Sequence, residues 1–223
     1  MSVSSIDNHQ HNNYIDGFGR YVSEKNIVFF LITGLPRSRT AWIAQYFQGL
    51  EGVSCFHEPE SKENDIASVL DRLSDVYGLY SGISSSAISF WTDNELKSFN
   101  GCKSLIIERN IDDVIESLNE AEMGLSEDTN IKICDYIIKS YERIEKSTDC
   151  MKIKYGNLDD PYYMKSIQNH LTPQTMFDYK YWEYMMETNI QLDMNKWKRN
   201  NMLTGSNNSF VKELERRINF LIK

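Results

Sequence analysis

Unbroken apolar runs mark the strands of this chain. Residues 27–33 are aliphatic, aromatic or β-branched throughout, and such a run is typical of a strand covered on both faces, as in a parallel sheet between helices. Residues 53–56 and 104–108 predict two further strands, and residues 151–155, in which basic and apolar side chains alternate, predict a strand at the sheet edge. We therefore expect a mostly parallel sheet.

Apolar residues at helical spacing fill the intervals between these strands. They predict helices over residues 38–47, 66–80, 112–118 and 128–147, and the capping-box pattern of Thr92 and Glu95 predicts a short helix there. Beyond Asp159 the pattern is helical to the end, apart from a linker-like break at 205–208. The order of elements predicts an α/β fold: a three-layer sandwich with a mostly parallel central sheet and a helical C-terminal third.

Length and composition narrow the class of protein. The 223 residues suit one domain, residues 14–223, behind a polar and flexible tail of residues 1–13. Acidic residues outnumber basic ones, 32 against 24, and the net charge of −8 argues against a nucleic acid as partner. The longest apolar run, residues 27–32, is too short to span a bilayer, so we expect no membrane partner.

The N-terminal residues show no secretory signal pattern. The four cysteines are widely spaced and form no Cys-x-x-Cys pair, so we expect reduced thiols and a cytoplasmic protein. His9 and His11 could ligate a metal ion, but a loose tail explains them better, and we expect no metal site.

The segment with most chemical information is residues 33–42, Thr-Gly-Leu-Pro-Arg-Ser-Arg-Thr-Ala-Trp, where the first strand turns into a helix. Such a turn directs unpaired backbone N–H groups and the positive end of the helix at one point, which suits a phosphate or sulfate. Arg37 and Arg39 add positive charge and bidentate donors. The alternative is a plain strand–helix connection with solvated arginines.

This loop is not the phosphate loop of kinases and NTPases. That pattern, started at Gly34, requires Gly, Lys and Ser/Thr where this chain has Arg39, Thr40 and Ala41. The missing lysine would have gripped the transferable phosphate, and the missing hydroxyl would have held magnesium. An anion cradle without a provision for metal is what remains.

The segment resembles the first loop of the sulfotransferase family, which commonly reads Pro-Lys/Arg-Ser-Gly-Thr-x-Trp and here reads Pro-Arg-Ser-Arg-Thr-Ala-Trp from Pro36 to Trp42. The resemblance implies a P-loop NTPase-like fold and 3′-phosphoadenosine 5′-phosphosulfate (PAPS) as sulfuryl donor. It also implies that Arg37 holds the phosphosulfate. Arg39 stands where the family usually has glycine. The implied donor-binding residues of this loop are Arg37, Ser38, Arg39, Thr40 and Ala41.

A second match strengthens this resemblance. The family's next signature is an arginine at the end of a buried strand and a serine eight positions later, as in Arg109 and Ser117 here. Two helical turns of spacing let both side chains point at one 3′-phosphate. The alternatives are a surface salt bridge for Arg109 and a helix-packing role for Ser117. Less specifically, residues 155–158 and 195–199 resemble later segments of the family.

His57 and Glu58 follow the second strand and should reach the same sheet edge. Either side chain can accept the proton that an attacking hydroxyl or amine must lose, and the resemblance favours Glu58; an exposed strand end before Pro59 is the alternative. The resemblance thus implies sulfuryl transfer from PAPS to a small molecule or glycan, with His57, Glu58 and Arg37 as catalytic residues. A divergent P-loop kinase and a non-catalytic binding module on the same fold are the other hypotheses.

Overall fold

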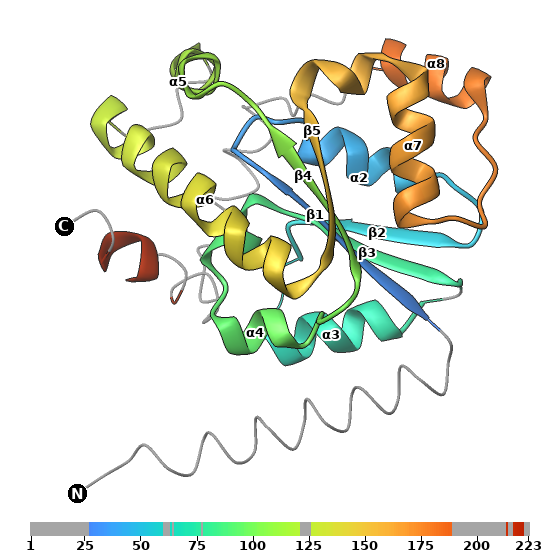
Figure 1. Ribbon diagram of the computed structural model, residues 1–223, viewed down its shortest axis with the longest axis horizontal. Helices are drawn as coiled ribbons and strands as arrows, with labels where there is room; N and C mark the ends of the chain where they lie inside the picture. The colour runs from blue at the N-terminus through green and yellow to red at the C-terminus, as the bar shows by residue number, and fades with distance from the viewer. Residues whose placement is uncertain are drawn as a thin grey trace, which may run out of the picture.

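The computed structural model describes residues 27–59, 63, 65–76, 78–120, 126–188, 213 and 216–220 (Figure 1). Its centre is a five-stranded sheet in the order β2-β3-β1-β4-β5, and every neighbouring pair of strands is parallel. The strands are β1 Val28–Gly34, β2 Val53–His57, β3 Tyr80–Ser84, β4 Lys103–Glu108 and β5 Asp149–Lys154. The carboxyl ends of all five therefore meet at one edge.

Helices cover both faces of the sheet (Figure 1). One face carries α2 Thr40–Gln48, α7 Pro161–Leu171 and α8 Tyr179–Glu187, together with the 3₁₀ turn η3 Tyr155–Asp159. The other carries α3 Ile66–Ser74, η2 Ser86–Phe90, α4 Asp93–Lys97, α5 Ile111–Glu120 and α6 Glu127–Ser147. The three-layer α/β sandwich with a parallel central sheet, predicted from the sequence, is confirmed.

The central strand shows why the sequence forms two cores. Successive side chains of a strand point to opposite faces. In β1, Phe29 and Leu31 accordingly pack with α3 to α6, whereas Phe30 and Ile32 pack with α2 and α7. All four are at most 8% exposed. The apolar run predicted a strand buried on both sides, and the structure has one.

One predicted helix is too long. The helix expected over residues 66–80 ends at Ser74, and Tyr80–Ser84 forms β3, a strand that the apolar pattern did not reveal. A Cβ on Gly82 would lie 2.2 Å from the ring of Phe30. The bulk of the neighbouring strand thus excludes a large side chain at the middle of β3, and with it the apolar run typical of a buried strand.

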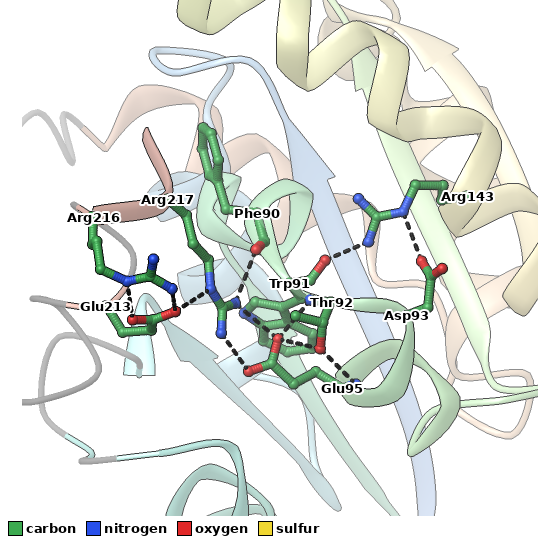
Figure 2. Close-up of polar contacts among 9 residues, drawn as sticks. All are labelled: Phe90, Trp91, Thr92, Asp93, Glu95, Arg143, Glu213, Arg216 and Arg217. Carbon is green, nitrogen blue, oxygen red and sulfur yellow. Dashed lines mark hydrogen bonds and ion pairs between the residues drawn. The ribbon is translucent and has the colours of Figure 1, made fainter. Parts of the chain in front are cut away.

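The C-terminal residues 216–220 are helical and lie against the layer that holds α4 and α6 (Figure 1). Figure 2 shows the contacts that attach them, centred on Arg217 and the buried Glu95. Residues 172–178 between α7 and α8 are not helical, contrary to the prediction beyond Asp159. The predicted tail 1–13, the segment 195–199 and the break at 205–208 lie outside the described residues. Within the described ranges, no helix has the length and apolar character needed to cross a membrane.

Candidate anion-binding site

The loop from β1 to α2 lies at the carboxyl edge of the sheet, where the chain leaves β1 for one face and leaves the neighbouring β4 for the other. Ligands of open α/β sheets bind in the crevice that such a reversal creates. Gly34, the last residue of β1, fits tightly there, because a Cβ would lie 2.8 Å from the carbonyl oxygen of Ile107 in β4. The glycine lets the end of β1 approach β4 closely.

The loop itself has an unusual backbone. Arg37 and Arg39 have φ angles of 64° and 60°, in the left-handed region that favours glycine. Each such residue costs roughly 1–2 kcal/mol, so the surrounding contacts must offset the strain. Ser38 lies between them, fully buried, and its backbone N–H donates to the carbonyl of Leu35 at 3.2 Å.

Arg37, Arg109 and Ser117, all predicted from the sequence, meet at this loop. The Nε of Arg37 donates to the hydroxyl of Ser117 at 3.1 Å, across 80 residues of sequence. An Nη of Arg109 donates to the carbonyl of Arg37, and the other donates to the carbonyl of Asp113 at 3.3 Å. The structure gives the Nη groups of Arg37 no partner within the described part of the chain, so they remain available to an anion.

The amino end of α2 adds further donors. The cap residue Arg39 makes no side-chain capping bond, and the first turn holds no acidic residue. By contrast, side chains cap α3, α4, α6, α7 and α8. The first N–H groups of a helix have no partner within the helix, and together with the helix dipole they attract anions. Of these helices, α2 is the one whose first turn keeps its donors beside two arginines.

His57 and Glu58 lie beside the first turn of α2. The Nε2 of His57 is 3.4 Å from the hydroxyl of Thr40 and 3.8 Å from Oε1 of Glu58. Burial lowers the pKa of His57, and the charge of Glu58 opposes this with a smaller rise, so the ring is neutral at pH 7. Glu58 has a φ of 46°, and its backbone N–H donates to the carbonyl of Ser84 at 3.1 Å. The carboxyl ends of β2 and β3 thus bring a neutral imidazole and a carboxylate to the loop.

Among solved structures, mouse sulfotransferase SULT7A1 complexed with PAP resembles this chain, with a TM-score of 0.50 and 14% sequence identity. The fold is sulfotransferase-like. The likeness covers 72% of this chain and 62% of the mouse chain, so it spans less than two thirds of that protein. No protein-family model matches the sequence, and no curated protein matches it.

Within this sulfotransferase-like fold, the other predicted residues of the loop are placed as follows. The hydroxyl of Ser38 is buried without a hydrogen-bond partner among the described residues, and a buried hydroxyl left unpaired costs about 1–3 kcal/mol. Ala41 lies half-buried in the first turn of α2. Arg39 turns its side chain away to η3, where it pairs with Asp159. The donor-binding roles of these residues stay predictions.

Three residues of the site are not among the predicted site residues. Ser84 donates its hydroxyl to the carbonyl of Thr40 at 2.8 Å and so joins β3 to α2. Tyr155 lies under the guanidinium of Arg109, with 4.3 Å from Cζ to the ring centroid, and Asp159 holds Arg39. Tyr155 belongs to a segment that resembles the family, and Ser84 begins a run of three serines that a pocket lining and a plain polar loop explain equally well; nothing in the sequence pattern marks Asp159.

The described residues contain no group of three His, Cys, Asp or Glu side chains placed to hold a metal ion. The donors that the site does present are guanidinium groups, hydroxyls and helix N–H groups. Such donors bind phosphate and sulfate oxygens.

Proposed function

We propose that the protein is a sulfotransferase that moves a sulfuryl group from PAPS to a hydroxyl or amine of a small molecule or glycan. The observation that supports this most is the convergence of Arg37, Arg109 and Ser117 on the uncapped amino end of α2. The mouse neighbour, a sulfotransferase described as complexed with PAP, supports a nucleotide ligand of the same kind.

In this proposal the first loop holds the phosphosulfate end of the donor. The free Nη groups of Arg37, the helix N–H groups and the hydroxyl of Thr40 bind its oxygens. The hydroxyl of Ser38, buried without a partner among the described residues, is a further donor in the same loop. Arg109 and Ser117 brace Arg37 from the side of α5, and their remaining hydrogen-bonding groups bind the 3′-phosphate.

His57 or Glu58 takes the proton of the acceptor as its oxygen or nitrogen attacks sulfur. A bond from the acceptor to sulfur forms, and the bond from sulfur to the bridging phosphate oxygen breaks in line with it. The bridging oxygen keeps the electron pair, and Arg37 stabilises the negative charge that develops there. A neutral His57 is ready to accept a proton at pH 7, and Glu58 stabilises the imidazolium that results.

The test is calorimetric binding of adenosine 3′,5′-bisphosphate, the nucleotide left after transfer. We expect micromolar or tighter binding by the wild type and at least a tenfold loss of affinity in Arg109→Ala. The variant loses the hydrogen bond that supports the loop and a cation that contacts the nucleotide. Arg216→Ala is the matched control, since Arg216 is 70% exposed and contacts only Glu213 among the described residues.

Absence of binding by the wild type would overturn the proposal. Binding without transfer of labelled sulfate to any acceptor in a cell extract would instead favour a non-catalytic module. Magnesium-dependent turnover of ATP would favour the kinase hypothesis.

A further inference from the structure

We infer that Arg39 is a positioning residue: its side chain rests on Asp159 and Tyr155 in η3 and thereby holds the first loop in the shape that binds the nucleotide. The inference rests on the proposed function, since it assigns the loop to that ligand. It gives a role to the arginine that stands where the resembling family has glycine, and it assigns Asp159 a role in the same site.

The side chain of Arg39 leaves the loop and crosses to η3. One Nη donates to a carboxylate oxygen of Asp159, 120 residues away, and forms an ion pair with it. Its Cζ lies 5.0 Å from the centroid of the Tyr155 ring, and the Cζ of Arg109 lies 4.3 Å from the same centroid. Two arginines of the site therefore share one aromatic ring.

This contact compensates for a backbone that arginine does not favour. Arg39 has a φ of 60° and is the residue from which α2 starts. Glycine would adopt this φ without an energetic penalty, whereas a residue with a Cβ is destabilised by steric contact with its own backbone. The ion pair and the ring contact are available only while the loop holds this shape, so they stabilise the backbone whose N–H groups face the anion.

The support on which Arg39 rests is itself fixed. Leu158 of η3 is fully buried in the core between the sheet and α7, and the backbone N–H of Asp160 donates to the carbonyl of Asn157 at 3.2 Å. Asp160 then caps α7 through the N–H of Tyr162 at 2.8 Å. Asp159 thus extends from a short turn held on both sides, which suits it to restrain another segment.

Two substitutions of Arg39 separate positioning from direct contact. Arg39→Ala keeps the unfavourable φ and loses the support, so the free loop leaves the binding shape and the affinity for adenosine 3′,5′-bisphosphate falls about tenfold. Arg39→Gly also loses the support but carries no φ penalty, so the affinity falls about threefold or less. A direct ligand contact would make both variants lose affinity equally, and that result would overturn the inference.

Asp159→Asn supplies the second arm. It should weaken binding about fivefold in the wild-type background and add little when combined with Arg39→Gly, because Asp159 acts only through Arg39. The matched control is Asp160→Asn, which keeps an acceptor for the α7 cap and removes a neighbouring charge. Equal losses of affinity in Asp159→Asn and Asp160→Asn would contradict the inference. So would a further fivefold loss when Asp159→Asn is added to Arg39→Gly.

Amide hydrogen exchange of Ser38 and Ile43 in the free protein tests the same claim without a nucleotide, because their N–H groups donate to the carbonyls of Leu35 and Arg39 and so report the shape of the loop. Exchange should be faster in Arg39→Ala and Asp159→Asn than in the wild type. The exchange rate of Arg39→Gly should lie between those of the wild type and Arg39→Ala. If the wild type fails to bind the nucleotide while these rates change as expected, the proposed function is wrong and the positioning role stands. If binding is found and the rates do not change, the positioning role is wrong.

Discussion

His57 is a residue whose environment acts on its charge in two opposite directions. Its Nε2 lies 3.4 Å from the hydroxyl of Thr40 and 3.8 Å from the carboxylate of Glu58. Burial disfavours the imidazolium and is the larger effect, whereas the carboxylate favours it. A histidine whose pKa is held down by burial stays available as a proton acceptor at physiological pH, which general-base catalysis requires.

We expect an NMR titration of His57 to give a midpoint below the ordinary value of 6.5, and Glu58→Gln to move it lower still because the favourable charge is removed. The unfolded chain then binds a proton before the folded one as pH falls. The stability that the neutral ring contributes is therefore present above about pH 6.5 and is lost as pH falls toward the folded pKa.

The rate of transfer provides the functional half of this prediction. If His57 is the base, the transfer rate should fall at low pH along the His57 titration curve. In Glu58→Gln this fall should move to lower pH together with the titration. A midpoint above 6.5 in the wild type, or an upward shift in Glu58→Gln, would contradict the electrostatic account.

At the scale of elements, the end of β1 has to fit between its neighbours before the loop can reach α2. Gly34 pairs with Ile107 of β4, and its missing side chain leaves room for the carbonyl of that residue. The loop that follows therefore starts where β1 and β4 lie in close contact.

Gly34→Ala should destabilise the protein by about 1–3 kcal/mol, since the added Cβ would lie 2.8 Å from a backbone oxygen that cannot move without distorting the sheet. Gly156→Ala in η3 is the matched control, because no atom lies within 4 Å of the Cβ it would gain. Urea unfolding measures both. Equal free energies of unfolding would show that β1 and β4 can separate at this point without cost.

The strands β1 and β4 were predictable because each contains an unbroken apolar run in the sequence. The edge position of β5 was predictable because its basic and apolar side chains alternate. The strand β3 was not, because it is built from Tyr, Ser, Gly, Ile and Ser, and its burial follows from neighbours that the sequence does not identify. The same limit applies to the site. Because parallel strands end at one edge, Arg37 was predicted to bind one end of a nucleotide there, and Arg109 with Ser117 the other end. The direct hydrogen bonds of Arg37 with Ser117 and Arg109 were not predicted. Asp159 was not predicted at all, because its contact with Arg39 depends on where η3 lies beside the loop.

At the scale of the whole molecule, the C-terminal helical residues close the layer opposite the one that carries α2. Arg217 donates to both oxygens of Glu95, at 2.9 and 3.2 Å, and to the carbonyl of Phe90 at 3.0 Å (Figure 2). Glu95, 8% exposed, also accepts from the backbone N–H of Thr92 and so completes the capping box of α4. A single carboxylate thus completes the capping box of α4 and holds Arg217 of the helical residues 216–220.

Arg217→Met should cost about 3 kcal/mol, because it leaves the buried charge of Glu95 without its cation while keeping the bulk of the side chain. Adding Glu95→Gln should recover part of this loss, since glutamine can still complete the capping box and brings no buried charge that would lack a partner. Guanidinium unfolding of the single and double variants measures both values. Arg216→Met is the control, with a change of about 0.5 kcal/mol or less expected because its pair with Glu213 lies at the surface. If Arg217→Met were no worse than Arg216→Met, the C-terminal residues would not be anchored through Glu95, and their attachment would have to come from the packing of Ile218 against the core.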